Sequence, residues 1–190
     1  MAEARVRTMT AEEFYLWQLD QDERYELVDG VPTPLRAMTG ASNAHDVILV
    51  NCIIELGMRL RGKRCRVASA DTALRTSIRS ARRPDVTVDC APPEAGSYEA
   101  HRPTAVVEVL SPSTRKIDRF TKLEECRRHP SLRHILLVDP DAIAAKLYSR
   151  ADEGAWSDVD LIGKDAVIAL PAIDVTLPLG ALYERLDMTA

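Results

Sequence analysis

The chain has 190 residues, 46% of them hydrophobic, and a formal net charge of −4. This length supports one sizeable core and is short for two, so we expect residues 1–190 to form a single domain. The acidic balance argues against a surface that is basic throughout, and the longest apolar stretch, around residues 47–60, is too polar to span a bilayer. We therefore expect a cytoplasmic protein with no membrane span and no export signal.

Four cysteines stand far apart in the chain, at Cys52, Cys65, Cys90 and Cys126. They form no C-x-x-C pair of the kind found in zinc knuckles or redox motifs. We expect all four to be reduced thiols, as is usual in the cytoplasm.

The first part of the chain predicts a helix and a hairpin. Residues 10–13 (TAEE) form a capping-box pattern, so a short amphipathic helix should begin after Thr10 and end before Asp20. A hairpin is expected next, with residues 24–28 as its first arm and the segment from residue 31 onward as its second. The turn between them is Asp29-Gly30, because Asp-Gly readily adopts the positive φ angles of a tight turn.

The middle of the chain predicts a long helix followed by several strands. Residues 43–61 carry a broad apolar surface without proline, which indicates a deeply packed helix. Segments rich in valine and threonine predict strands over residues 65–70, 72–76, 84–90 and 104–111.

A parallel crossover is expected in the second half. A helix from about residue 113 to residue 128 leads to an apolar strand over residues 133–138, and strand, helix, strand in this order is typical of parallel pairing. Shorter signals follow for strands over residues 142–148, 156–162 and 173–177 and for a helical segment over residues 179–186. The interpretation is an α/β protein.

Basic residues cluster locally, within residues 59–66, 79–83 and 115–122. Each cluster by itself is typical of a solvated face.

Glu108 is the one carboxylate in the run 105–110 (AVVEVL), which otherwise indicates a strand buried on both faces. A buried carboxylate must be protonated, paired with a cation or bound to a metal. A salt bridge to an arginine is the simplest alternative to a metal.

Asp85 begins a second valine-rich strand, in which alternation places Asp85, Thr87 and Asp89 on one face. Alone, Asp85 is typical of an exposed acidic strand end. Beside Glu108 it would form half of a hard-cation site, since Mg²⁺ takes one or two carboxylates and fills its other positions with water or phosphate oxygens. That site requires the two strands to be adjacent.

The helix after Glu108 carries a charged stripe opposite an apolar one. At about 100° per residue, the charged stripe contains Arg115, Asp118, Arg119 and Lys122, and the apolar stripe contains Ile117, Phe120 and Leu123. If this helix lies beside Glu108, Arg115 and Arg119 could bind substrate phosphates, and Lys122 could orient or polarise the attacking water. The alternative is a solvated stripe with an ion pair between Asp118 and Lys122.

Glu26 and His45 are further candidates with simpler interpretations. A glutamate in a hairpin usually lies on the wet face, and a histidine near a helix start is usually a surface or satisfied polar group. The chain has no phosphate-loop, dinucleotide-binding or serine-hydrolase signature.

A family resemblance covers nearly the whole chain, from about residue 10 to residue 186. The segments that carry it are 25–30 (YELVDG), 84–86 (PDV), 106–114 (VVEVLSPST), Asp118, Lys122 and 137–140 (LVDP). They resemble the Uma-two family of restriction-endonuclease-like proteins, which is placed in the PD-(D/E)XK nuclease superfamily. The resemblance implies a central mixed β-sheet flanked by helices and Mg²⁺-dependent cleavage of DNA.

The resemblance also implies roles for individual residues. Asp85 matches the motif aspartate and Glu108 the second acid, whereas Leu110 stands where the motif lysine is usual. A lysine from the following helix would replace it, and Lys122 is the first choice with Lys116 as the fallback. Glu26 matches an acidic residue near the chain start, and His45 lies where the family tends to carry a histidine.

The resulting hypothesis is a metal-dependent endonuclease that acts on nucleic acid, with DNA as the expected substrate. Asp85, Glu108 and Glu26 would hold Mg²⁺ or Mn²⁺, and Lys122 would aid the nucleophile. One alternative is a catalytically degenerate nuclease fold that binds nucleic acid, and another is an assembly module whose acids are structural ion pairs. A homodimer would let two sites address two strands.

Overall fold

The computed structural model of the chain describes residues 8–35, 42–110 and 118–188. In chain order its elements are α1 (Ala11–Gln18), β1 (Tyr25–Val28), β2 (Val31–Pro34), α2 (Asn43–Leu60), β3 (Arg66–Ser69), β4 (Leu74–Ser77), β5 (Ser80–Arg82), β6 (Val86–Asp89), β7 (Pro103–Val109), α3 (Asp118–Arg128), β8 (His134–Asp139), β9 (Ala144–Arg150), β10 (Trp156–Ile162), β11 (Val167–Leu170), the 3₁₀ turn η1 (Pro171–Ile173), β12 (Val175–Pro178) and the 3₁₀ turn η2 (Leu179–Tyr183).

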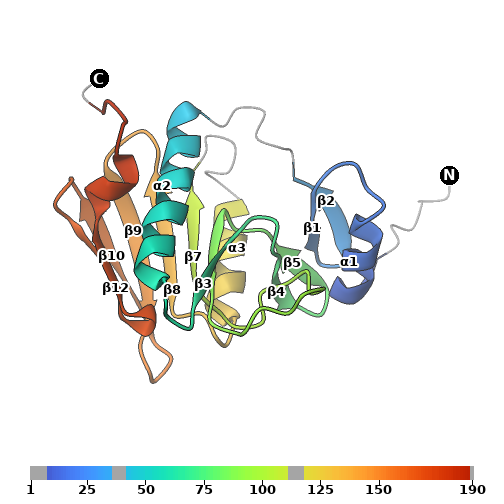
Figure 1. Cartoon of the computed structure of the whole chain (residues 1–190). Helices are drawn as coiled ribbons and strands as arrows, with labels where there is room; N and C mark the ends of the chain where they lie inside the picture. Colours follow the sequence, from blue (N-terminus) through green and yellow to red (C-terminus); the bar gives the residue numbers. More distant parts are fainter. Residues whose placement is uncertain (1–7, 36–41, 111–117, 189–190) are drawn as a thin grey trace.

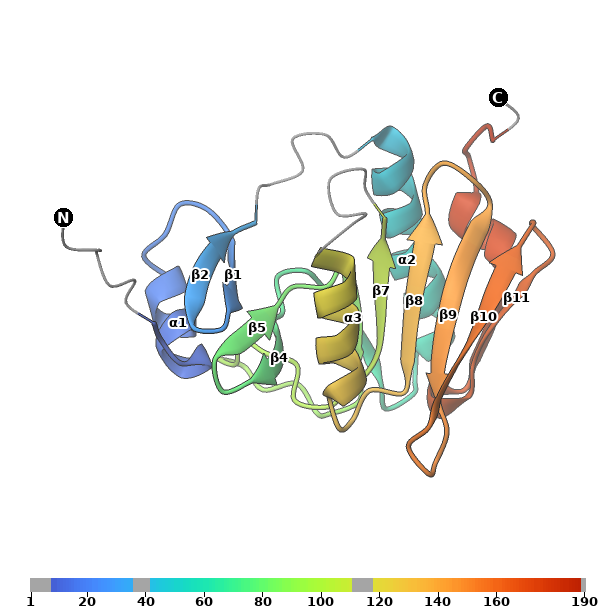
Figure 2. The same cartoon turned by 180° about the vertical axis from the view of Figure 1, so that it is seen from behind.

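A six-stranded sheet forms the centre of the fold, in the order β10-β9-β8-β7-β6-β3. Neighbouring strands are antiparallel except β7 and β8, which are parallel and are joined through α3. Helix α2 covers the face seen in Figure 1, and α3 covers the opposite face, seen in Figure 2. The predicted mixed sheet flanked by helices and the predicted parallel crossover are both confirmed.

Strand β7 contributes to a separate core on each face of this sheet. Val107 packs in a cluster that includes Cys52 and Leu56 of α2, whereas Val106 packs in a cluster that includes Leu123 and Cys126 of α3. Because successive side chains of a strand point to opposite faces, the position of Glu108 belongs to the α3 face.

A smaller sheet, in the order β2-β1-β5-β4, lies beside the central one together with α1 (Figure 1). Its core contains the fully buried side chains of Phe14 and Leu27. The hairpin predicted at Asp29-Gly30 is confirmed: β1 and β2 pair antiparallel, and the two turn residues have φ angles of 49° and 85°.

Two strands and one helix differ from the sequence-based expectation. Strands β5 and β11 were not predicted, since β5 has only three residues, Ser-Ala-Arg, and β11 has four. The expected C-terminal helix is the shorter 3₁₀ turn η2.

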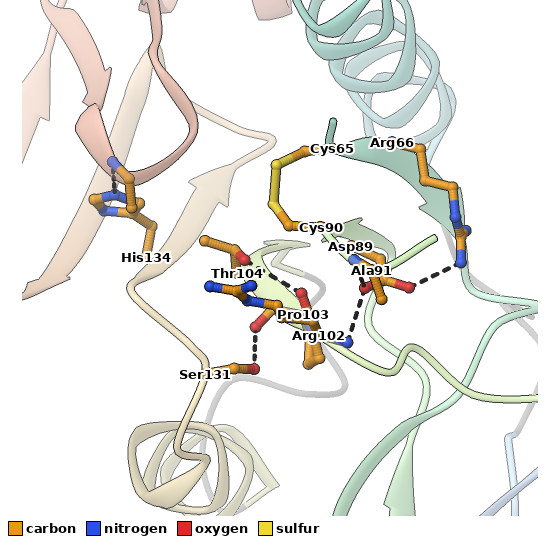
Figure 3. Close-up of a disulfide and its surroundings, with 11 residues drawn as sticks. Cys65, Arg66, Asp89, Cys90, Ala91, Arg102, Pro103, Thr104, Ser131 and His134 are labelled. Carbon is orange, nitrogen blue, oxygen red and sulfur yellow. Dashed lines mark hydrogen bonds and ion pairs between the residues drawn. A yellow bond between two sulfur atoms is a disulfide. The ribbon is translucent and has the colours of Figure 1, made fainter. Parts of the chain in front are cut away.

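The expectation of four reduced cysteines is wrong for two of them. Cys65 and Cys90 form a disulfide with a Cα–Cα distance of 4.0 Å (Figure 3). The reason is the register of β3 and β6, in which Arg66 pairs with Asp89, so the next residue outward on each strand is a cysteine. Cys52 and Cys126 are free and buried.

Within the described ranges, no helix is long and apolar enough to cross a bilayer.

Candidate functional site

Asp85 and Glu108 occupy neighbouring backbone positions at one end of the central sheet. Val86 pairs with Val107 in the antiparallel register of β6 and β7, so the next positions outward are Asp85 and Glu108. The backbone N–H of Val109 donates a hydrogen bond of 2.8 Å to Asp85 Oδ2. The adjacency that the expected metal site requires is therefore present.

His45 approaches Asp85 from the first turn of α2. Its Nε2 lies 3.7 Å from Asp85 Oδ2, and its side chain is only 7% exposed. The neighbouring Asp85 carboxylate is the main cause that raises the pKa of His45 above its ordinary value, against the opposing effect of burial. His45 is thereby favoured as a cation that holds the Asp85 carboxylate.

The start of helix α2 is fixed by an N-cap, and this places His45 in the first turn of the helix. The side chain of Ser42 caps the helix by accepting a hydrogen bond from the backbone N–H of His45. The Nδ1 atom of His45 is buried and makes no hydrogen bond within the part of the chain that the structure describes.

The Glu26 carboxylate is buried rather than on the wet face of its hairpin, and three protein donors surround it. Oε1 lies 3.1 Å from Lys122 Nζ and accepts a 2.9 Å hydrogen bond from the backbone N–H of Arg83. Oε2 accepts a 3.1 Å hydrogen bond from Arg82 Nη1. Glu26 and Lys122, more than ninety positions apart in the printed sequence, thus form an ion pair.

Arg82 and Glu125 complete this buried network, and neither was a candidate from the sequence. Arg82 donates two hydrogen bonds of 2.7 Å to the two carboxylate oxygens of Glu125, which also accepts one of 2.9 Å from Thr76. Burial acts to lower the pKa of Arg82, but hydrogen bonding to Glu125 and the charge of Glu26 leave it raised overall. The guanidinium is therefore a permanent cation inside the protein.

Sequence reasoning missed Arg82 because it belongs to the run of arginines in residues 79–83, which is typical of a solvated face. In the structure Arg82 is only 3% exposed. The available signal was its place two residues before Pro84-Asp85, on a segment that must enter the central sheet.

The thiol of Cys126 is buried on α3, within electrostatic range of Glu108, Glu125 and Lys122. Burial is the main cause that raises its pKa to about 12, and the carboxylates of Glu108 and Glu125 raise it further, while Lys122 lowers it. These effects place Glu108 within electrostatic range of the same face of α3 that carries Lys122 and Glu125.

The remaining predictions concern residues at the start of α3 and just before it. Arg115 and Lys116 lie outside the described residues, and Arg119 lies in the first turn of α3. The assignment of Phe120 to the packing side is wrong, because its side chain is 73% exposed. The helix instead turns Leu123 and Cys126 into the core, which leaves Phe120 on the outer side.

The donor set at the end of β6 and β7 fits a hard divalent cation with an incomplete protein shell. Among residues 8–35, 42–110 and 118–188, no three His, Cys, Asp or Glu side chains group closely enough to form a metal cage. Asp85 and Glu108 still offer two carboxylates at neighbouring positions, which is the number that Mg²⁺ uses when water or phosphate fills its other positions.

Comparison with known proteins gives concordant results. The family model Uma2, described as "Putative restriction endonuclease", matches residues 11–180. In Synechocystis sp., the "Uncharacterized protein slr1290" is 31% identical over 180 residues, covering 94% of this chain and 93% of that protein. The "Uncharacterized protein sll1609" of the same organism is 25% identical over 172 residues, covering 88% and 96%.

A solved structure shares the fold. The crystal structure of "a putative nuclease belonging to DUF820" from Anabaena variabilis superposes with a TM-score of 0.71 at 18% sequence identity, covering 92% of this chain and 97% of that chain.

Proposed function

Because this chain belongs to the Uma2 family, whose description is "Putative restriction endonuclease", we propose that it hydrolyses phosphodiester bonds in nucleic acid, with DNA as the substrate. The observation that supports the proposal is that Asp85 and Glu108 follow paired residues of adjacent strands, at one end of β6 and β7. A pair of carboxylates on adjacent strands is the arrangement that a Mg²⁺- or Mn²⁺-dependent nuclease needs.

Asp85 and Glu108 are the residues that would hold the cation. The Asp85 carboxylate is held in place by the hydrogen bond from the backbone N–H of Val109 and by the neighbouring His45 side chain. When bound, Mg²⁺ or Mn²⁺ lowers the pKa of a coordinated water and neutralises phosphate charge. His45 supports the site by fixing the Asp85 carboxylate, a role that needs no contact with substrate.

Lys122 would supply the positive charge that the motif lysine usually gives, since Leu110 cannot. Its ion pair with Glu26 limits the directions in which the side chain can point. We assign Glu26 to the positioning of Lys122, and direct contact of Glu26 with the cation stays a prediction. Phosphate binding by Arg115 and Arg119 likewise stays a prediction.

The test is cleavage of supercoiled, linear and single-stranded DNA in Mg²⁺ or Mn²⁺. We expect Glu108→Gln and Asp85→Asn to lower the rate by about a hundredfold or more, because each removes a charged metal ligand. Lys122→Gln should lower it by about 10- to 100-fold.

Two matched controls accompany these variants. Glu124→Gln changes a surface carboxylate that pairs with Arg127 on α3, and Lys164→Gln changes an exposed lysine beyond β10. Both should cleave as the unmodified protein does. A folded Glu108→Gln protein that retains full activity would exclude this site.

A degenerate nuclease fold that binds nucleic acid without cutting it is the second candidate. Leu110 in place of the motif lysine favours it, since Lys122 must serve instead from another element. In that case DNA binding would be salt-sensitive and unchanged by EDTA, and no variant would alter cleavage because none would occur.

A further inference from the structure

A pocket of about 590 Å³ lies at the opposite end of β6 and β7 from Asp85 and Glu108. Its walls include the Cys65–Cys90 disulfide after β6 and Thr104 near the start of β7 (Figure 3). Thr104 and Glu108 are four positions apart along β7, which corresponds to roughly 13 Å. The pocket is therefore distinct from the proposed active site.

Positive charge dominates the lining of this pocket. Its basic residues are Lys63, Arg64, Arg102 and Arg133, and its one acidic residue is Asp174. Asp174 is already matched, because Lys63 Nζ lies 2.7 Å from its Oδ2. Three arginines therefore remain without a compensating carboxylate in the lining.

The arginines are not saturated by other protein groups. Within the described part of the chain, no carboxylate pairs with Arg64 or Arg102, and Arg133 donates one hydrogen bond of 3.2 Å, to the backbone oxygen of Ala151. Like charges gathered in a concave surface raise the local potential and attract an anion.

Buried interactions fix the backbone around the pocket. Asp89 is completely buried, and its Oδ1 accepts hydrogen bonds of 3.0 Å from the N–H of Ala91 and 2.9 Å from the N–H of Arg102. Its Oδ2 accepts one of 2.8 Å from Arg66 (Figure 3). These bonds and the adjacent disulfide hold the segments that carry Arg64 and Arg102 in place.

We propose that this pocket is a phosphate-binding site. Guanidinium groups match phosphate oxygens with paired hydrogen bonds, and three of them suit a group that carries more than one negative charge. The volume lies in the range of small-ligand pockets, which is larger than a single phosphate needs and points to pyrophosphate or a nucleotide.

The test is calorimetric titration of the full chain with pyrophosphate and with ATP at low ionic strength, in EDTA so that no metal contributes. The variant is the double substitution Arg64→Gln with Arg102→Gln. The control is Arg61→Gln with Arg128→Gln, which removes the same charge from two exposed residues outside this pocket. Thermal melting of each variant checks that it is folded.

We expect both phosphate compounds to bind, the double variant to lose at least tenfold in affinity, and the control to stay within twofold. A DNA oligonucleotide without terminal phosphate identifies the source: if it competes with pyrophosphate, the pocket takes backbone phosphates, and if it does not, the pocket serves small molecules. The proposal is overturned if neither compound binds, if citrate binds as tightly, or if the control loses as much affinity as the double variant.

Discussion

Glu26 has two possible uses at the site, and they can be separated by one substitution. Its carboxylate contacts Lys122 and Arg82 in the structure, whereas the family resemblance implies contact with a metal. We expect Glu26→Gln to slow cleavage by about 10- to 100-fold, because the amide no longer orients a charged lysine. The Mg²⁺ concentration for half-maximal rate should stay unchanged. An increase in that concentration would instead make Glu26 a metal ligand.

His134 gives the protein a pH-dependent term in its free energy of unfolding. Burial is the main cause that lowers its pKa to about 4, so the folded protein holds it neutral while the unfolded chain binds a proton near pH 6.5. Stability from this residue is therefore complete above about pH 6.5 and falls as the pH drops toward 4.

We expect the full loss to be on the order of 3 kcal/mol, from about 1.4 kcal/mol for each pH unit between the two pKa values. Urea unfolding at pH 7 and at pH 5 should show a smaller decrease for His134→Gln than for the unmodified protein. Equal decreases in the two proteins would assign the pH dependence to other groups.

Some single residues were predictable from the sequence and others were not. Glu108 stood out because a carboxylate in a run of buried aliphatic residues needs a partner. Arg82 and Glu125 did not stand out, because a charged residue on a short strand or an amphipathic helix is expected to be exposed to solvent until its packing partner is known. The Cys65–Cys90 bond depends on the register of two strands, which residue spacing alone does not specify.

At the scale of elements, Arg82 connects β5 of the small sheet with α3, the helix that covers one face of the central sheet. We expect Arg82→Met to destabilise the protein by about 3–5 kcal/mol, because Glu26 and Glu125 would keep buried charges without their cation. Chemical denaturation with the urea midpoint as readout measures the change.

Arg75→Met is the matched control for this experiment. Arg75 on β4 pairs with Glu12, whose side chain is 61% exposed, so its loss should cost less than about 1 kcal/mol. If Arg82→Met and Arg75→Met lowered the free energy of unfolding by the same amount, the buried network would not join the two sheets.

Element prediction succeeded where a local signal was strong. The hairpin at Asp29-Gly30 and the long helix α2 follow from turn chemistry and from apolar content, and both are present. For α3, the sequence placed Phe120 on the packing side together with Leu123, whereas the side chain of Phe120 is exposed. Lys122 and Glu125 turn inward to contact Glu26 and Arg82.

For the molecule as a whole, we propose that the two sheets unfold together as one domain. Trp17 follows the small sheet, since it packs beside Tyr25, and Trp156 lies in β10 of the large sheet. Each of the variants Trp17→Phe and Trp156→Phe keeps one tryptophan, so its fluorescence reports on one sheet. In each variant, the urea midpoint by fluorescence should equal the midpoint by circular dichroism, which reports on the whole chain. Separate midpoints would divide the chain into two cooperative units.

The Cys65–Cys90 bond has a consequence for a chain that has been cut. The residues between the two cysteines include Arg82 and Asp85, and also an exposed turn with Arg79 at which trypsin can act. A single cut after Arg79 would leave two fragments that migrate as one species on a non-reducing gel and separate only after a thiol reductant is added. The piece that carries Asp85 would thus stay tethered to α2, and so to His45, after its own peptide backbone had been broken.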